Sequence, residues 1–473
     1  MHTKNVTTEQ PDIGKIDIQS LEQVFNDLIE LIQSQAREHK AKGSAVPSQI
    51  LTRKMIPLSH ERTETGICVT RFQPMLIQKE DWRNVSYKLF SNISKSPQLQ
   101  AFRERLSSIE GKNVHSQIES AIPKIIESSL TGEFLKSSDL LVLFLKSLRY
   151  IPVSASCTID VRGVSIKGVS SIDFNIGARR FTFRQVKIED FEQELDVFLP
   201  TDTRFGMFGM QPPNSILRIE MEAWRPLEFQ IETAKALVLL RLFKVCATSF
   251  GHQSWDTVNP FAIIKGATQH AGPIALTSHE VTLTSESGKQ LERFWNSVEP
   301  KLPPELSEIT SKRNTPLAIA YERYSDSLLS SHPIERKIAF AIMGLEAIYL
   351  PENEVQELMY RLQIRVCKAL SKINFNSKEV RSDLKSGYKI RNLYVHGGHL
   401  SDAEKGKYEN KGIAVSELAS RLLDYLRISI LHLVISGQSK SAFLELLEDS
   451  FIERDQDDRL QAIFESEKAI LRI

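Results

Sequence analysis

The residues with the clearest potential for chemistry are Arg391, Asn392 and His396, which lie in the run Tyr388-Lys-Ile-Arg-Asn-Leu-Tyr-Val-His-Gly-Gly. If the run is helical, Asn392 and His396 share a face, and Arg391 lies about 140° round from His396. The long arginine side chain could reach across, so that a guanidinium and an imidazole converge. Such a pair can hold a phosphate and transfer a proton, which is the chemistry that cuts a phosphodiester.

Two glycines follow the histidine, and glycine adopts the left-handed conformation that ends a helix at little steric cost. Gly397 and Gly398 therefore predict a helix end that places His396 in the last turn. The partial negative charge at a helix C-terminus stabilises the imidazolium, which suits proton transfer. A histidine before a terminal glycine is also a common helix end without chemistry, and the spacing alone leaves both interpretations open.

Three ordered pieces of the chain resemble the HEPN superfamily, and most of all its Apea-like branch. The Arg391-to-His396 spacing resembles the arginine–histidine motif of that family. Residues 342–349, around Glu346, resemble its Leu-Glu helix, and residues 357–365 resemble the helix that follows. The resemblance covers about residues 305–450. It implies a helical bundle that acts as a metal-independent endoribonuclease, commonly dimeric, in bacterial defence against phage or in toxin systems.

The resemblance also implies roles for individual residues. His396 would act as general base or acid on the ribose 2′-hydroxyl or the leaving 5′-oxygen, and Arg391 would hold the phosphate. Asn392 would orient the histidine or hydrogen-bond the phosphate. Glu346 and Tyr394 would support this group from around it. A cyclic phosphate product follows, with no metal and no cofactor.

Glu346 stands among apolar residues on its own helix face, so its carboxylate is expected to point toward a core. A buried carboxylate needs a partner. One interpretation is that Glu346 orients Arg391 or His396. The other is that it pairs with a structural arginine, Arg361 or Arg365, and burial arguments do not separate the two.

Residues 371–400 hold six basic side chains against two acidic ones. Lys385 and Lys389 are expected to contact RNA, because cations beside the motif would neutralise phosphates and release their counterions. A solvated helix face explains a charge run of this size equally well. Aromatic residues suited to base stacking are sparse nearby, so readout of base sequence is not expected.

His396, His399 and Asp402 have a spacing that suggests a metal site, but no further nitrogen or sulfur ligand is spaced to complete one. We therefore expect no metal. The four cysteines lie far apart without a C-x-x-C pair, which predicts free buried thiols.

The composition is that of an ordinary globular protein, and the formal net charge of +1 means that any basic surface must be local. No apolar run approaches the ~18 residues needed to span a bilayer. The polar N-terminus lacks the apolar core of a signal peptide. These observations predict a cytoplasmic protein with no membrane partner.

A chain of 473 residues is too long for one core. Changes in the spacing of its hydrophobic residues divide it into five parts. We expect a flexible tail over residues 1–19, a mainly helical region over 20–150, a β-rich domain with one long helix over 151–303, a HEPN-like helical bundle over 304–451, and a charged tail over 452–473. The fold class is α+β. The β-rich domain is the candidate sensor for a phage-derived or cellular trigger.

The expected helix over residues 415–436 is more apolar than a one-sided surface helix needs, so it is either central or a dimer face. RNA and a second copy of the chain are the expected partners. The alternative function belongs to another class: a non-catalytic RNA-binding or protein-interaction module in which the bundle only dimerises.

Overall fold

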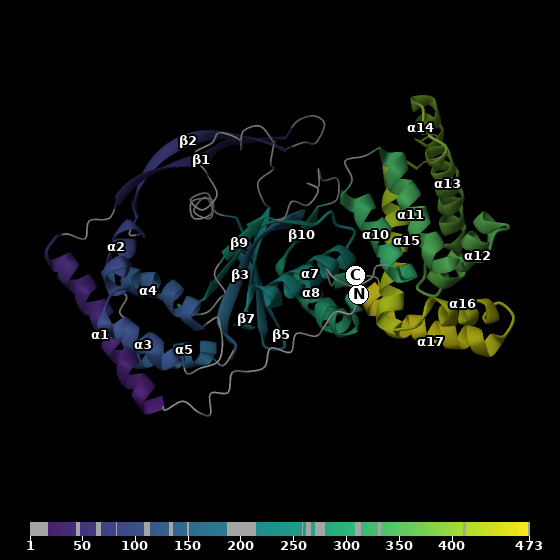
Figure 1. Ribbon diagram of the computed structural model, residues 1–473. Helices are drawn as coiled ribbons and strands as arrows, with labels where there is room; N and C mark the ends of the chain where they lie inside the picture. The colour runs from purple at the N-terminus through teal and green to yellow at the C-terminus, as the bar shows by residue number, and fades with distance from the viewer. Residues whose placement is uncertain are drawn as a thin grey trace.

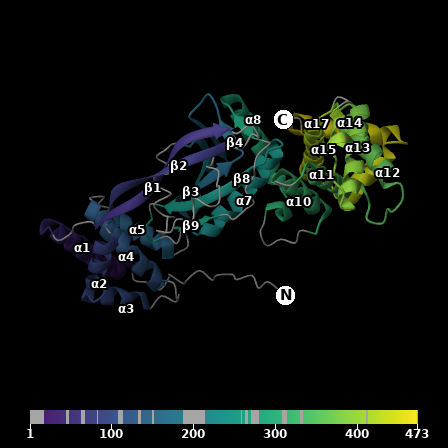
Figure 2. The ribbon, with the colours of Figure 1, turned by 90° about the horizontal axis from the view of Figure 1, so that it is seen from above.

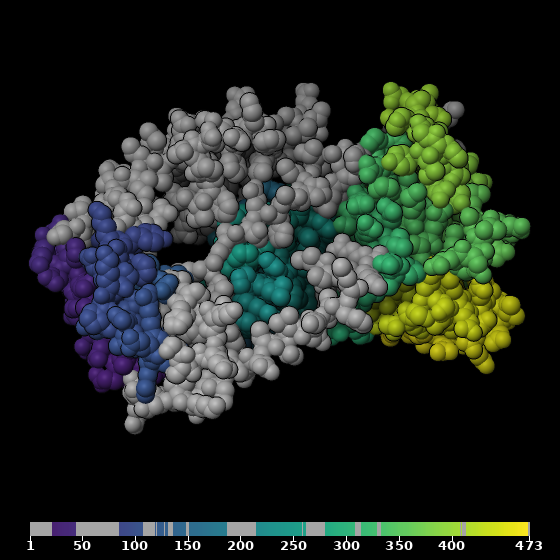
Figure 3. Space-filling model, viewed as in Figure 1, coloured from purple at the N-terminus to yellow at the C-terminus, as the bar shows by residue number. Residues whose placement is uncertain are grey.

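The computed structural model describes residues 18–43, 48–62, 68–81, 83–107, 114–131, 136–148, 151–186, 214–257, 259–261, 266–269, 280–307, 314–329, 333–409 and 413–471. The described elements form three parts that follow one another from left to right in Figure 1: N-terminal helices, a sheet with helices on it, and a C-terminal helical bundle. The view from above keeps this order (Figure 2). In the space-filling view the bundle forms one mass at the end away from the N-terminal helices (Figure 3). The expected α+β layout is confirmed at this level. The expected tail lies outside the described residues, except that residues 18 and 19 begin the first helix.

The N-terminal part packs five helices around a core of its own. These are α1 (Ile18–Ala41), α2 (Arg83–Ile93), α3 (Pro97–Ser107), α4 (Val114–Thr131) and α5 (Ser137–Leu148). Phe25 of α1 stacks on Phe144 of α5 with ring centroids 5.4 Å apart. Phe261, which lies far later in the sequence, belongs to the same core. An antiparallel hairpin of β1 (Ser48–Arg62) and β2 (Cys68–Asp81) interrupts this mainly helical region.

The middle part is built on a six-stranded antiparallel sheet with the order β5-β6-β7-β3-β8-β9. Its strands are β3 (Val153–Arg162), β5 (Ser171–Ile176), β6 (Arg179–Gln185), β7 (Ser215–Ala223), β8 (Ser249–Thr257) and β9 (Gly266–Gln269). Alternate residues of β3 and β5 are buried, as their period of two predicts. A separate parallel pair joins β4 (Val164–Ile166) to β10 (Val281–Leu283).

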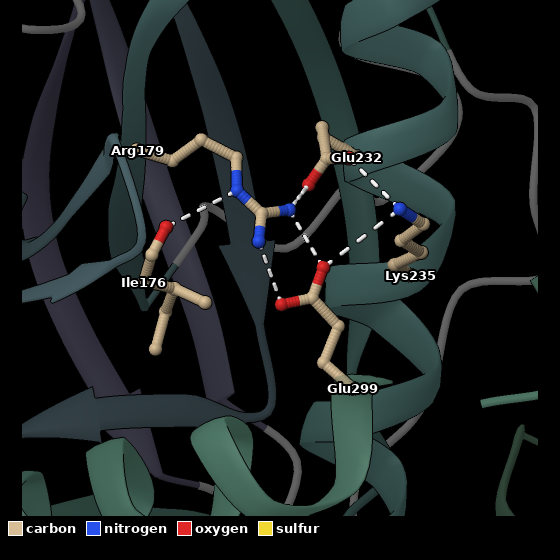
Figure 4. A network of polar contacts seen from close by, with 5 residues as sticks. All are labelled: Ile176, Arg179, Glu232, Lys235 and Glu299. Atoms are coloured by element: carbon tan, nitrogen blue, oxygen red, sulfur yellow. Dashed lines mark hydrogen bonds and ion pairs between the residues drawn. The ribbon is translucent and has the colours of Figure 1, made fainter. Parts of the chain in front are cut away.

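Two helices, α7 (Pro226–Phe243) and α8 (Ser285–Val298), lie between the sheet and the bundle (Figure 1). A short 3-10 helix, η3 (Glu299–Lys301), follows α8. Arg179 of β6 grips Glu299 with two nitrogens, at 2.6 and 2.7 Å, and also pairs with Glu232 of α7 (Figure 4). Lys235 bonds Glu232 at 3.0 Å. This paired network ties α7 and η3 to the edge of β6 without leaving a net charge.

The C-terminal part is helical throughout its described residues. Its helices are α9 (Pro304–Ser307), α10 (Pro316–Leu329), α11 (Ile334–Tyr349), α12 (Leu358–Ser371), α13 (Ser377–Val395), α14 (Asp402–Glu409), α15 (Val415–Ser436), α16 (Lys440–Asp449) and α17 (Arg454–Leu471). Helix α15 contacts α8, α10, α11, α13 and α17 and is buried nearly all round. Of the two interpretations of this apolar helix, the central one holds, because the chain covers the apolar surface itself.

Most of the segment expected to be a charged tail, residues 452–473, forms α17, a helix docked on the bundle. It buries Leu460, Phe464 and Leu471 against the bundle. Oε2 of Glu467 and Nδ1 of His432 on α15 form a hydrogen bond of 2.7 Å, and both side chains are buried. The high charge of the segment concealed an apolar stripe of only a few residues.

The sheet and the bundle share one continuous core across the expected boundary at Pro303-Pro304. Arg427 of α15 donates to the carbonyls of Leu242 and Phe243 at 3.0 and 3.3 Å. The hydroxyl of Tyr324 on α10 donates to the Arg241 carbonyl at 2.7 Å. These bonds satisfy the last carbonyls of α7 and join the two parts.

Candidate functional site

The motif lies at the C-terminal end of α13, and its two glycines end the helix as predicted. Gly397 has φ +79°, a conformation that a side chain disfavours. Its N–H donates to the Tyr394 carbonyl at 2.9 Å, and that of Gly398 donates to the Leu393 carbonyl at 2.8 Å. This pair of bonds is a Schellman motif. His396 is the cap residue, just beyond the last helical position.

Close packing of α13 against α11 and α15 positions the motif. Gly387 is buried, and a Cβ there would stand 2.7 Å from Leu422 Cδ1 of α15 and 3.0 Å from Ile342 Cδ1 of α11. Glycine thus lets the three helix backbones approach closely. One turn further along α13, Arg391 reaches Glu346, which is one turn further along α11 from Ile342.

Glu346 pairs with Arg391 across this helix contact. Nη2 of Arg391 donates to Oε2 of Glu346 at 3.2 Å, and both side chains are mostly buried. Burial raises the pKa of the Glu346 carboxyl, and the nearby guanidinium opposes that rise. Arg361 and Arg365 bind Glu354 instead, so of the two pairings left open by the sequence the structure has the one with Arg391.

Two further side chains hold the guanidinium. Nη1 of Arg391 donates to Oδ1 of Asn392 at 3.1 Å, and the guanidinium carbon lies 5.5 Å from the centre of the Tyr388 ring. Burial raises the pKa of the Tyr388 hydroxyl, and the Glu346 charge adds to the effect. Tyr388 is a member of this group that was not singled out from the sequence, although it precedes Arg391 by nearly one helical turn. Tyr394 packs edge-on against Phe340 with ring centroids 6.5 Å apart.

His396 is exposed and does not converge with Arg391 in one cavity. A cavity of about 270 Å³ is lined by Arg391, Glu346 and Lys440, and also by Glu352 and Glu354. His396 is not among the lining residues. Within one chain, therefore, the arginine faces a cavity that also holds three carboxylates, while the histidine faces solvent.

The basic strip on α13 is exposed and leads to His396. Lys378, Lys385, Lys389 and His396 follow one another at seven, four and seven residues, which places them on one helix face, with Arg381 beside them. The structure thus groups Lys385 and Lys389 with the histidine rather than with the arginine.

The strip differs from the sequence expectation at two positions. Lys372 is buried and pairs with Asp457 of α17, so it is not part of the surface. Asp383 is also buried, where it accepts a hydrogen bond from the Tyr425 hydroxyl at 2.9 Å. Burial raises the pKa of the Asp383 carboxyl. That carboxyl is therefore not part of the exposed strip.

Among the described residues, no group of three or more His, Cys, Asp or Glu side chains is placed to hold a metal ion. Cys157, Cys246 and Cys367 carry free thiols, and the first two are buried. The side chain of Cys68 lies outside the described residues. None of the described helices has the length and apolar character required to cross a membrane.

Comparisons of this chain with family models, with curated proteins and with solved structures found no match. The resemblance to the HEPN superfamily therefore rests on the residues of α11, α12 and α13 given above.

Proposed function

We propose that the protein is a metal-independent endoribonuclease of the HEPN type that acts in bacterial anti-phage defence or in a toxin-like system. The observation that carries the proposal is the half-buried pair of Glu346 on α11 and Arg391 on α13, the helix that ends at His396. Withdrawing the Glu346 carboxylate from water costs free energy of folding, and groups whose pKa is shifted by burial cluster at functional sites.

The proposed reaction needs only the side chains of the chain. The His396 imidazole takes the proton of a ribose 2′-hydroxyl, and the freed oxygen attacks the adjacent phosphorus. The bond from phosphorus to the 5′-oxygen breaks, and the leaving oxygen takes a proton from the His396 imidazolium or from water. The products are a 2′,3′-cyclic phosphate and a 5′-hydroxyl. Arg391 stabilises the charge that develops on the phosphate, while Glu346 and Asn392 hold the guanidinium. An RNA strand along Lys385 and Lys389 would present its ribose to His396.

We propose further that the active form is a homodimer, because Arg391 and His396 face different surroundings within one chain. A second copy related by a two-fold axis brings the histidine of one chain near the arginine of the other. The β-rich domain, which shares a core with the bundle, is the proposed sensor of the trigger.

The test is incubation of the purified chain with total tRNA in EDTA. We expect discrete cuts that leave cyclic phosphate ends. His396→Ala and Arg391→Ala should each slow cutting by about a hundredfold or more, since loss of one charge-stabilising group costs ~3 kcal/mol. His399→Ala, an exposed histidine three residues on, is the matched control and should keep full activity. Wild-type rates in both variants, or activity that stops in EDTA and returns with a divalent ion, would refute the proposal.

A second candidate, a non-catalytic RNA-binding module, is favoured by one observation. Both terminal nitrogens of Arg391 already donate hydrogen bonds, one to Asn392 and one to Glu346. Three carboxylates also line the cavity that this arginine faces. The strip with Lys385 and Lys389 is then the only RNA contact proposed. This candidate predicts a mobility shift with tRNA but no cuts, and loss of the shift when both lysines are changed to alanine.

A further inference from the structure

A second cavity, of about 400 Å³, lies at the opposite end of α13 from His396. It is formed by one face of α12, the first turns of α13 and the turn after α16. Figure 1 shows α12 beside the end of α13 that lies away from α14. Three cations line the cavity, Lys368, Lys378 and Arg381, and no carboxylate is among its described lining residues. Its charge therefore suits an anion, unlike that of the cavity around Arg391.

Two exposed aromatic side chains line this cavity. Tyr360 of α12 is 52% exposed, and Phe451, which follows α16, is 46% exposed. The Lys368 ammonium lies 5.1 Å from the centre of the Phe451 ring. It is itself held by Asp457 and by the Ser450 carbonyl, each at 2.9 Å. Exposed rings are the surfaces on which bases of single-stranded nucleic acid stack, and a ring that is held in place loses less conformational entropy on stacking.

A buried and unpaired donor lines the same cavity. Gln363 is only 5% exposed, yet among the residues that the structure describes its Nε2 has no hydrogen-bond partner. An amide donor left unpaired out of water destabilises the fold. A bound molecule with an acceptor atom in the cavity removes that cost. This donor is independent of the cations, and it indicates a ligand that carries both negative charge and a polar acceptor.

The cavity is continuous with the exposed basic strip that leads to His396, because Lys378 belongs to both. Lys378 and His396 lie about 27 Å apart along α13, at ~1.5 Å per residue. Two acids lie between them in the sequence. Asp383 is buried, and Glu379 pairs with Arg421 of α15. A strand that enters the cavity can therefore follow exposed cations along α13 to the histidine.

We propose that this cavity holds one unpaired nucleotide of the RNA strand that lies along α13, with the cut site of the strand at His396. The phosphate meets the two exposed cations of α13 that line the cavity. The base stacks on Tyr360 or Phe451, and an oxygen or ring nitrogen of the base accepts from Nε2 of Gln363. Because only an unstacked base can enter the cavity, the preferred substrate has single-stranded RNA beside the cut. The inference rests on the proposed function, whose binding of RNA is measured separately.

Fluorescence anisotropy with labelled r(U)12 tests the proposal on the full chain carrying His396→Ala, so that the probe is not cut. Twelve nucleotides span the cavity and the strip even when stacked at ~3.4 Å each. We expect Tyr360→Ala to weaken binding by about fivefold or more, because it removes a stacking surface. Gln363→Leu should weaken binding severalfold. Tyr87→Ala, which alters a 62% exposed tyrosine of α2, is the matched control and should change nothing.

An abasic strand of twelve units, with the same charge, separates the base from the phosphate. Arg381→Ala should weaken the binding of both probes by a similar factor. Tyr360→Ala and Gln363→Leu should leave the affinity for the abasic strand unchanged. Gln363→Leu should also keep or raise the melting temperature, because it replaces an unpaired buried amide with an apolar side chain of similar size. A merely structural role of either residue would not distinguish the two probes.

An r(U)12 affinity that neither Tyr360→Ala nor Gln363→Leu changes would overturn the inference. If Lys385→Ala/Lys389→Ala still weakens binding in that case, the RNA uses the strip alone and the proposed function stands. A parent protein that binds total tRNA but not r(U)12 would also overturn the inference, and one that binds neither would overturn the proposed function with it. If Tyr360→Ala abolishes binding of labelled poly-L-glutamate but not of r(U)12, the cavity takes an acidic protein segment and the inference fails.

Discussion

At the scale of single residues, the direction of Arg391 is the central feature of the proposed site. Its guanidinium has the Glu346 carboxylate at 3.2 Å and the Asn392 amide oxygen at 3.1 Å. Glu346 is the costly partner, because burial works against its ionised form and raises its pKa above the ordinary value of 4.5. The arginine is thus aimed at the expense of stability.

This cost predicts a pH dependence of stability. Because the native carboxyl of Glu346 binds a proton more readily than the unfolded one, its contribution to the free energy of unfolding grows as the pH falls through the raised pKa toward 4.5, and is lost as the pH rises. Glu346→Gln has no such titration. Urea unfolding from pH 7 to pH 4.5 should therefore show the wild type gaining stability relative to the variant. A constant difference across that range would contradict this account.

At the scale of elements, helices far apart in sequence depend on a few buried contacts. The polar contacts that dock α17 include a buried pair, the His432 and Glu467 side chains. Phe464 lies beside this pair, and its ring stacks on the imidazole with centroids 4.0 Å apart. The close approach of α11, α13 and α15 rests on Gly387. Each contact predicts a large effect from a small change.

Glu467→Ala should reduce the free energy of unfolding by about 3 kcal/mol, since it leaves a buried histidine nitrogen without its partner. Glu465 lies two residues earlier on the same helix but is half exposed and pairs with Lys468 on the surface. Its replacement by alanine should cost within about 0.5 kcal/mol. Chemical denaturation of the two variants measures both values, and equal losses would show that α17 does not rely on the buried pair.

Gly387→Ala should destabilise by about 1–3 kcal/mol, because its new Cβ would stand 2.7 Å from Leu422 Cδ1 and force the helices apart. Gly406 of α14 is a suitable control, since a Cβ there meets no atom within 4 Å. Alanine at that helical position should be neutral or stabilising by up to about 1 kcal/mol. Thermal unfolding distinguishes the two, and a neutral Gly387→Ala would mean that the helix contact adapts.

At the scale of the whole molecule, the sheet and the bundle share one hydrophobic core. The N-terminal helices pack around a separate core. A hydrogen bond from Arg427 of α15 to the end of α7 joins the bundle to the part of the chain built on the sheet. Movement of the sheet would therefore reach α15, and through it α13, more directly than movement of the N-terminal helices. The apolar surface of α15, which suggested a dimer from the sequence, is covered within the chain and supports no dimer.

The proposed dimer now depends on the separation of Arg391 and His396. If each site takes its arginine from one chain and its histidine from the other, mixing equal amounts of inactive Arg391→Ala and His396→Ala chains should restore about a quarter of the wild-type cutting. Random exchange makes about half of the dimers mixed, and each mixed dimer retains one of its two sites. Either variant mixed with itself is the control. A fully active monomer in light scattering, or no recovery on mixing, would limit the site to a single chain.

The sequence by itself determined the features that depend on neighbouring residues. The apolar stripe predicts α15 with the ends that it has, and Gly397 predicts the end of α13, because both depend on helical spacing and on local backbone conformation. The alternation of β3 is local in the same way. The docking of α17 was not expected from the sequence, because its charged residues far outnumber its few buried apolar positions.

Only the tertiary structure decided which residues meet. The sequence left three arginines open as partners of Glu346. Its pairing with Arg391, 45 residues away, depends on how closely α11 and α13 approach. The pairing of Lys372 with Asp457 removes a cation from the strip for the same reason. His396 is exposed and does not line the cavity that Arg391 faces, which the spacing of the two residues could not show. Spacing along one helix defines a face, but what that face meets is set by the packing of the others.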